Sequence, residues 1–377
     1  MIILKSIAVK KIRDLIRPNI ANILPYPPGK PIEEVKRELG VNEVIKMASN
    51  ENALGPSPKA LEAIKKAATD VNLYPDGNAY YLKQKLAQKL GVSIDEIIVG
   101  NGTDEIIRII TETFLNPGEE VVVAWPGFVI YSIATQVMAG ALRRTPLKNY
   151  THDLEAMLKA VTGKTKLIFI ANPNNPTGTM VDKNEVESFM EKVPNDVIVV
   201  FDEAYYEYAD KNFPKTLQYM KEGRNVIILR TFSKIYGLAG LRVGYAVAKK
   251  EILVEMNRIR QPFNVNRIAQ SAAIAALDDT EHVRKSIAMN EEGKEFLYGE
   301  LDSLGLEYVP TVANFILVNI EKDGRKVYEQ LLKEGVIVRP VDNYDLPNFI
   351  RVTICKPSEN KKFIKSLKNV LEYKNLK

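Results

Sequence analysis

Several residue types are scarce in this sequence, and each shortage excludes a class of structure or chemistry. The 377 residues include one cysteine, Cys355, so no internal disulfide can form, and we expect a buried thiol without a role in the chemistry. The only two histidines, His152 and His282, fall in segments that we expect to be helical and on the surface. A catalytic proton must then be moved by another group, for which lysine is the natural candidate. The single tryptophan, Trp125, is assigned to packing.

Long apolar runs and a surplus of one charge are also missing. No run approaches the roughly 18 to 20 apolar residues that a membrane-spanning helix needs. Residues 1–16 lack the continuous apolar core of a signal peptide, and their spaced isoleucines predict an amphipathic helix that docks on the body of a cytoplasmic protein. The 52 basic and 47 acidic residues are interleaved, and the net charge of +5 forms no basic stripe, which argues against a nucleic-acid partner.

The order of apolar runs predicts an α/β fold with two lobes. Between residues 97 and 231, five short apolar runs each end in a polar or glycine-rich cluster, and helical patterns lie between them. Two further helices are predicted earlier in the chain, over residues 56–68 and 79–90. Runs that are apolar on both faces predict a mainly parallel sheet inside a three-layer αβα domain. The later pattern of helices and strands predicts a smaller α+β domain. The predicted domains are an N-terminal arm packing with the small domain (1–48), a large domain (49–265) and the small domain (266–377).

Polar clusters follow the predicted strands, where ligands bind in parallel sheets. Each cluster also has a plain structural explanation. Gly102 and Thr103, as a turn and a helix N-cap, are explained by capping roughly twice as readily as by phosphate binding. Asp202 ends an apolar strand and needs a partner, so structural and functional explanations are even. The clusters are NGTDE (101–105), NPNNPTG (172–178), DEAYYEY (202–208) and TFSKIYGLAGLR (231–242).

A lysine such as Lys234 is usually solvated, and its neighbours are what favour function. An acid, an amide, hydroxyls, a lysine and an arginine all come at successive strand ends of one predicted sheet. Together the four clusters resemble the motifs of fold-type I pyridoxal-phosphate enzymes of the class I/II aminotransferase superfamily, in order and spacing, from about residue 45 to the end. The stretches LPYPPGKP (24–31), YPDG (74–77), GVIVRP (335–340) and FIRVTI (349–354) closely resemble those of the histidinol-phosphate aminotransferase group.

The resemblance implies a role for each cluster around pyridoxal 5'-phosphate. Lys234 would form the Schiff base with the cofactor and, once freed, would shuttle the proton between substrate and cofactor carbons. Asp202 would pair with the pyridinium nitrogen, Phe128 would stack on the ring, and Asn175 and Tyr205 would hydrogen-bond its phenolic oxygen. The phosphate would be held by Gly102, Thr103, Asp104, Thr231, Ser233 and Arg242, with Tyr74 reaching across the interface of a homodimer.

For the substrates, the resemblance implies two anion sites. Arg351 matches the carboxylate-binding arginine of the family, and Arg339 matches a second anion-binding position, with Tyr26 and Asn175 nearby. An arginine inside an apolar strand is not easily dismissed as a surface charge, because an unpaired buried charge is costly. The implied reaction is a ping-pong transamination between L-histidinol phosphate and 2-oxoglutarate that gives 3-(imidazol-4-yl)-2-oxopropyl phosphate and L-glutamate, without a metal.

Three other interpretations stay open from the sequence. An aromatic or broad-specificity amino-acid aminotransferase of the same subgroup would prefer phenylalanine or tyrosine as the amine donor. A lyase that decarboxylates a phosphorylated amino acid would release carbon dioxide and need no oxo-acid acceptor. A silent binding module would keep the fold without the chemistry, although no motif residue is missing here.

Overall fold

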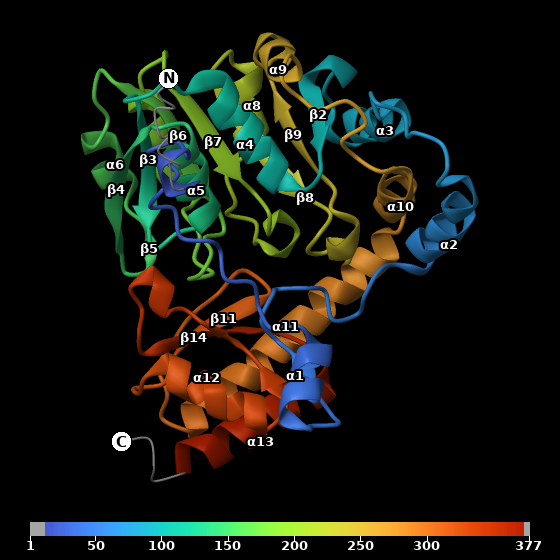
Figure 1. Cartoon of the computed structure of the whole chain (residues 1–377), viewed down its shortest axis with the longest axis vertical. Coiled ribbons are helices and arrows are strands. Elements are labelled where there is room, and N and C mark those ends of the chain that lie inside the picture. The colour runs from blue at the N-terminus through green and yellow to red at the C-terminus, as the bar shows by residue number, and fades with distance from the viewer. Residues whose placement is uncertain (1–11, 373–377) are drawn as a thin grey trace, which may run out of the picture.

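The computed structural model describes residues 12–372, which form two lobes (Figure 1). The larger lobe is built on an eight-stranded sheet with strand order β2-β9-β8-β7-β6-β3-β4-β5. Strands β8, β7, β6, β3 and β4 are parallel neighbours, whereas β9 runs antiparallel to β2 and β8, and β5 pairs antiparallel with β4. The strands are β2 (Ile97–Gly100), β3 (Glu120–Trp125), β4 (Ala141–Lys148), β5 (Thr151–His152), β6 (Thr165–Ala171), β7 (Ile198–Asp202), β8 (Val226–Thr231) and β9 (Gly244–Ala248).

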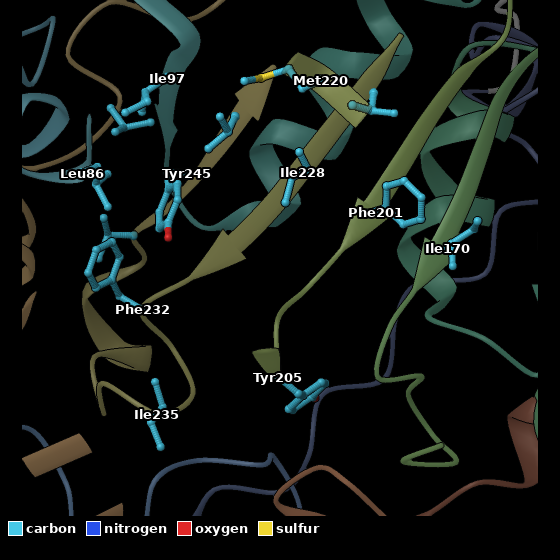
Figure 2. Packing of buried hydrophobic residues seen from close by; sticks show 14 of the residues in the cluster. Leu86, Ile97, Ile170, Phe201, Tyr205, Met220, Ile228, Phe232, Ile235 and Tyr245 are labelled. Atoms are coloured by element: carbon cyan, nitrogen blue, oxygen red, sulfur yellow. The ribbon is translucent and has the colours of Figure 1, made fainter. Parts of the chain in front are cut away.

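Helices cover both faces of this sheet, because neighbouring side chains of a strand point to opposite sides. In β7, Val199 and Phe201 join one core, and Ile198 and Val200 join the other. Figure 2 shows the first core, with Phe201 on its strand among residues from both the sheet and its helices. One face carries α4 (Thr103–Phe114), α5 (Val129–Val137) and α9 (Lys250–Asn257), and the other carries α2 (Pro58–Ala67), α3 (Tyr80–Leu90), α6 (Leu154–Lys159), α7 (Lys183–Lys192), α8 (Thr216–Lys221) and α10 (Arg267–Leu277).

The expected helices over 56–68 and 79–90 are α2 and α3. The Ser57 side chain caps α2 by accepting the backbone N–H of Ala60. Gly91 ends α3 with a φ of 64°, a left-handed conformation that glycine adopts without steric cost. The three-layer αβα arrangement predicted from the sequence is therefore confirmed.

The smaller lobe holds a four-stranded antiparallel sheet with strand order β10-β11-β14-β13. Three helices pack in its core, and the long α11 runs from one lobe to the other (Figure 1). The elements are α11 (Thr280–Ser303), β10 (Tyr308–Val309), β11 (Phe315–Asn319), α12 (Gly324–Lys333), β12 (Val336–Ile337), β13 (Arg339–Pro340), β14 (Phe349–Thr353) and α13 (Pro357–Glu372).

The described part of the N-terminal segment contacts both lobes. β1 (Ile45–Lys46) pairs in parallel with β12, and Val35 of α1 (Ile32–Leu39) packs in one small cluster with Leu332 of α12. Figure 1 shows α1 beside α12. Earlier in the chain, Asn19 Nδ2 donates to the carbonyl oxygens of Gln136 and Val137, both at 2.8 Å, at the end of α5 in the large lobe. The segment therefore spans the junction of the lobes.

Two features bear on the predicted organisation. Most of the amphipathic helix expected over residues 1–16 lies outside the described residues, and the part inside them is a single 3-10 turn, Ile12–Asp14. Helix α10 packs in the core of the large sheet, although the predicted boundary after residue 265 assigns it to the small domain.

The other 3-10 turns are η2 (Ala68–Asp70), η3 (Ile94–Glu96), η4 (Tyr206–Tyr208), η5 (Ala239–Leu241) and η6 (Asp342–Tyr344).

Candidate active site

One pocket lies at the carboxyl ends of the central strands, where parallel sheets bind ligands. Ten residues that the motifs singled out for the cofactor line it, so segments that lie far apart in the sequence meet there. Four more lining residues were not predicted. The lining residues are Thr103, Asp104, Phe128, Asn175, Asp202, Tyr205, Thr231, Ser233, Lys234 and Arg242, with Tyr131, Ala171, Pro173 and Ala204.

Lys234 follows β8 and opens onto this pocket from deep inside the molecule. Its Nζ donates to the Ser49 carbonyl oxygen at 3.2 Å and lies 5.6 Å from the centre of the Tyr205 ring. Burial, and then the nearby Arg351 guanidinium, lower the pKa of Lys234 to about 8, because both disfavour the charged amine. Roughly a tenth of Lys234 is therefore the neutral, nucleophilic amine at pH 7, far more than for an ordinary lysine.

Asp202 ends β7 and is buried at the floor of the pocket. Burial raises its pKa to about 6, while hydrogen bonds from the Tyr131 hydroxyl at 2.7 Å and the backbone N–H of Ala204 at 3.2 Å oppose that shift. Tyr131 was missed from the sequence, because a tyrosine inside an apolar helical pattern is typical of core packing. Its hydroxyl fixes the orientation of the carboxylate.

The start of α4 and the end of the 231–242 loop form a cradle for an anion. Gly102 has a φ of 77°, which other residues adopt only with strain, and a Cβ atom there would lie 2.4 Å from Arg242 Nη2 and push that guanidinium aside. The N-cap of α4 is Gly102, not Thr103 as predicted, because Thr103 already has helical geometry. Arg242 Nη2 lies 3.5 Å from Asp104, and its Nη1 lies 3.4 Å from Ser233 Oγ. Helix N–H groups and a guanidinium thus point into one place.

Aromatic and amide side chains complete the pocket. Phe128 lines it just before α5, with its ring edge-to-face with Tyr131 at 5.5 Å between centroids. Asn175 Oδ1 accepts a hydrogen bond from Arg351 Nη1 at 2.5 Å. The amide therefore connects the pocket to the small lobe.

Two buried arginines of the small lobe lie side by side behind Asn175. Arg339 in β13 and Arg351 in β14 are direct cross-strand partners, and their exposed fractions are 7% and 6%. Within residues 12–372 neither forms a salt bridge, and Arg351 Nε has no hydrogen-bond partner. Burial lowers the pKa of Arg351. Two like charges held opposite each other without an acid predict an anion as their missing partner.

The two predicted tyrosines outside the pocket lining differ in their surroundings. Tyr26 lies with its ring 5.1 Å from the Arg339 guanidinium, which also donates to the Pro27 carbonyl at 2.9 Å. Tyr74 is 79% exposed and stacks on Phe263, with ring centroids 4.7 Å apart. In this chain Tyr74 lies away from the pocket, on the surface.

Trp125 links the two lobes near the pocket. Its Nε1 donates to Asp345 Oδ2 at 2.5 Å, and its ring stacks on Tyr344 at 5.7 Å between centroids. The Arg144 guanidinium lies 4.4 Å from the centre of the indole. The predicted packing role is accompanied by a polar contact between lobes that the sequence did not indicate.

The histidines were wrongly placed on the surface of helices. His152 is buried in β5, and burial lowers its pKa to about 4. His282 is in α11 as expected but is buried, with Nε2 3.0 Å from the Gly55 carbonyl oxygen. Neither lines the pocket, so lysine stays the candidate proton carrier. Cys355 is buried as predicted, and burial raises the pKa of its thiol.

Two further tests concern the described residues alone. Among residues 12–372, no group of three or more histidine, cysteine, aspartate or glutamate side chains could hold a metal ion. In the same part of the chain, no helix combines the length and apolar character needed to cross a membrane.

Comparison with known proteins assigns the chain to a family. The model of aminotransferase class I and II matches residues 42–367. The chain belongs to this family. The family expected from the four motifs is thus confirmed, and the protein is an aminotransferase.

Individual relatives agree over nearly the whole chain. The histidinol-phosphate aminotransferase of Moorella thermoacetica is 56% identical over 357 residues, which are 94% of this chain and 92% of that protein. The one of Caldicellulosiruptor saccharolyticus is 51% identical, over 95% of this chain and all of that protein (100%). The crystal structure of the Sinorhizobium meliloti enzyme, in complex with pyridoxal-5'-phosphate, has a TM-score of 0.87 and 30% identity, and the match covers 94% of this chain and 97% of that one.

Proposed function

We propose that this aminotransferase uses pyridoxal phosphate to interconvert L-histidinol phosphate and 2-oxoglutarate with 3-(imidazol-4-yl)-2-oxopropyl phosphate and L-glutamate, in cytoplasmic histidine biosynthesis. One observation carries the proposal. A pocket that holds the Lys234 amine and the Asp202 carboxylate adjoins two buried arginines without a carboxylate partner among the described residues. The two relatives from Moorella thermoacetica and Caldicellulosiruptor saccharolyticus, both histidinol-phosphate aminotransferases, support this choice of substrate.

The residues present fit pyridoxal phosphate. The cradle beside Gly102, which a Cβ atom would fill, offers helix N–H groups and a guanidinium for the phosphate. Asp202 suits the ring nitrogen, Asn175 and Tyr205 suit the phenolic oxygen, and Phe128 suits the ring face. The proposed phosphate ligands are Gly102, Thr103, Asp104, Thr231, Ser233 and Arg242, with Tyr74 from a second subunit.

The chain's own groups then divide the work. When bound, the cofactor supplies an electron sink that stabilises negative charge at the substrate carbon. Lys234 would bind the cofactor through its amine and, once displaced, would move the proton at the substrate carbon, a role that its pKa of about 8 suits. Asp202 would pair with the protonated ring nitrogen and so stay ionised, and the Tyr131 hydroxyl holds that carboxylate in place.

The two arginines are the proposed anion sites. A ping-pong reaction places a phosphate ester and then a dicarboxylic oxo acid in one pocket, so the same cations serve both. Arg351 donates to Asn175 of the pocket, and we propose that it binds the substrate anion nearer the reacting carbon. Arg339, with the Tyr26 ring beside its guanidinium, is proposed to bind the distal phosphate or carboxylate.

The protein is also proposed to be a homodimer. Exposed aromatic and aliphatic side chains gather over residues 71–81 and Phe263, and this apolar patch suits a second copy of the chain. Tyr74 lies in the patch and would reach the cofactor phosphate of the neighbouring subunit. The patch residues are Val71, Leu73, Tyr74, Tyr80, Tyr81 and Phe263.

An aromatic amino-acid aminotransferase is the alternative, and one observation favours it. Tyr26 and Tyr344 lie close enough to Arg351 to affect its charge, so an aromatic side chain would find aromatic neighbours there.

A donor panel tests both functions. With 2-oxoglutarate as acceptor, we expect kcat/KM for L-histidinol phosphate to exceed that for phenylalanine and tyrosine by at least roughly a hundredfold, because only the phosphate uses the second arginine fully. Equal or higher values for the aromatic acids would favour the alternative. Borohydride should fix the cofactor to the wild type but not to Lys234→Ala, and fixation in that variant would refute the role of Lys234.

A further inference from the structure

Asn50 lies where the lobes meet, and its side chain is buried, with 1% of its surface exposed. Its Nδ2 donates to the Tyr205 hydroxyl at 2.8 Å. The backbone has a φ of 56° there, a left-handed conformation that asparagine tolerates better than most residues. Figure 2 shows Tyr205 beyond the carboxyl end of β7, at the lower edge of the core. Asn50 thus touches a residue that lines the pocket without lining it itself.

Thr353 determines which way the Asn50 amide points. The Thr353 hydroxyl accepts the backbone N–H of Asn50 at 3.0 Å and lies 3.2 Å from Asn50 Oδ1. The Thr353 hydroxyl thus accepts the Asn50 backbone N–H on one lone pair and donates its own proton to Asn50 Oδ1. The amide nitrogen then faces Tyr205, whereas a flipped amide would leave the Thr353 proton without its acceptor and would turn an oxygen toward the Tyr205 hydroxyl.

The direction of the Asn50 bond also fixes the role of the Tyr205 proton. Burial raises the pKa of Tyr205, although Arg351 and the Asn50 bond oppose the shift, so the hydroxyl is neutral near pH 7. An amide N–H can only donate, and therefore it uses an oxygen lone pair and leaves the hydroxyl proton available. That proton can go to an acceptor in the pocket.

We propose that Asn50 and Thr353 are positioning residues that direct the Tyr205 hydroxyl proton toward the phenolic oxygen of the cofactor. The inference rests on the proposed pyridoxal-phosphate function. A hydrogen bond donated to that oxygen stabilises its ionised form and lowers the pKa at which the bound cofactor titrates. The chain of donors runs in one direction, from Thr353 through Asn50 to Tyr205.

The same strand also serves the substrate. β14 carries Arg351 two residues before Thr353, and Arg351 Nη2 donates to the Ala48 carbonyl oxygen at 2.6 Å. Arg351 and Thr353 of β14 therefore both form hydrogen bonds with the short segment 48–50. The small lobe is linked in this way to the proposed anion site and to the cofactor oxygen.

Other groups around Tyr205 bear on any pH-dependent readout. Arg351 favours the ionised hydroxyl and Asp202 disfavours it. Phe315 packs against the ring without charge. The charged and titratable groups facing Tyr205 are Arg351 from β14, Lys234 after β8, Asp202 from β7, Tyr131 from α5, Tyr208 from η4 and Tyr344 from η6.

The test measures the pKa of the bound cofactor by visible absorption, without turnover. Asn50→Asp replaces the donor by an acceptor of the same shape, which takes the Tyr205 proton, and the cofactor pKa should rise by about one unit. In a Tyr205→Phe background the same change should move it by less than about 0.3 units, because the variant acts through Tyr205. An equal rise in both backgrounds would show a plain charge effect and overturn the inference.

A second pair of variants covers the case in which Asn50→Asp does not fold. Thr353→Val frees the amide to flip and should raise the cofactor pKa by roughly half a unit, and Thr353→Ser should restore it. An unchanged pKa in Thr353→Val would overturn the inference.

Asn52→Asp is the matched control, because Asn52 is buried in the same segment but donates to Ile235 and Ser286 instead. We expect it to change the stability and to leave the cofactor pKa unaltered, and a shift equal to that of Asn50→Asp would overturn the inference. A wild type that acquires no titrating visible band with pyridoxal phosphate would instead refute the proposed function.

Discussion

At the scale of single residues, burial pushes the two main ionisable groups of the pocket toward their neutral forms. The pKa of Lys234 falls to about 8, and that of Asp202 rises to about 6. Each group is thus less stable in its charged form than it would be in water, and a ligand of the opposite charge relieves that cost. The cofactor-free pocket is therefore a place where substitutions can stabilise the protein while removing its function.

Replacing Lys234 with methionine should stabilise the cofactor-free protein. The folded pKa of about 8 lies below the unfolded value of 10.5, so the lysine costs stability at pH 7 and ceases to do so as the pH rises past 10.5. We expect Lys234→Met to raise the free energy of unfolding by roughly 2 kcal/mol at pH 7, less than the full shift because the pocket admits water.

The measurement is urea unfolding of both proteins from pH 7 to 10. The gap between variant and wild type should narrow above pH 8, since the wild type then loses its buried charge. Lys361→Met, at an exposed lysine, should change stability little at any pH. A gap that widens with rising pH would contradict the pKa shift.

Removing the Tyr131 hydroxyl should weaken cofactor binding in a pH-dependent way. The hydroxyl holds down the pKa of Asp202, so Tyr131→Phe lets it rise further above 6 and leaves more protonated acid at neutral pH. We expect the Kd for pyridoxal phosphate to rise roughly tenfold at pH 7, with a smaller effect at pH 9. Equilibrium titration followed by absorbance measures both values. An effect that grows toward pH 9 would exclude this explanation.

Single residues were predictable from the sequence where they stood in short polar clusters after apolar strands. Lys234, Asp202 and Asn175 all line one pocket, as that pattern indicates. Tyr131 and Asn50 were missed, because their roles depend on partners far away in the sequence. Tyr131 bonds to Asp202, which lies 71 positions later, and Asn50 bonds to Tyr205, which lies 155 positions later. A tyrosine in a helix and an asparagine in a loop carry no local signal of such partners.

At the scale of elements, the pairing of β13 with β14 fixes the two arginines opposite each other. Such a pair is a burden on the unliganded protein, since like charges on adjacent strands repel and neither has an acid partner among the described residues. A buried arginine with a partner is the opposite case. Arg230 Nη2 lies 2.7 Å from Glu203, and both side chains are almost fully buried.

The two kinds of buried arginine should respond differently to methionine. Arg339→Met should leave the free energy of unfolding unchanged or raise it by about 1 kcal/mol, and should raise KM for the phosphorylated donor at least roughly tenfold. Arg230→Met leaves the buried Glu203 carboxylate without its cation and should lower the free energy of unfolding by about 3 to 5 kcal/mol. Chemical unfolding and steady-state kinetics measure these values. A large loss of stability in Arg339→Met would show that the arginine has a structural partner.

Most elements followed from hydrophobic periodicity, but their pairing did not. The pattern predicts β11, β14 and α12 well, since alternating or helical spacing is local. It gives no sign that β9 would run antiparallel within a parallel sheet, or that the two-residue β5 would bury His152. Those outcomes depend on which strands neighbour each other, which a single sequence does not encode locally.

At the scale of the whole molecule, the apolar patch predicts the oligomeric state. Phe263→Asp places a charge among exposed aromatic side chains and should dissociate the proposed dimer. Because Tyr74 then cannot reach the second subunit, activity should fall by at least roughly tenfold. Sedimentation velocity gives the mass, and an assay at the same concentration gives the rate.

The control for this experiment is an apolar residue with the same exposure elsewhere. Val254 in α9 is 47% exposed, against 45% for Phe263, and Val254→Asp should keep both mass and activity. A monomeric wild type, or a Phe263→Asp variant that stays dimeric and active, would reject the proposed interface.

The position of Trp125 gives the molecule a built-in optical probe. It is the only tryptophan in the chain, and its indole N–H reaches from the large lobe to Asp345 in the small one. The emission of an indole depends on the polarity of its surroundings and on nearby charges, here the Asp345 carboxylate and the Arg144 guanidinium. The natural fluorescence of the unlabelled protein should therefore report, in real time, whether the lobes separate or approach when a ligand enters.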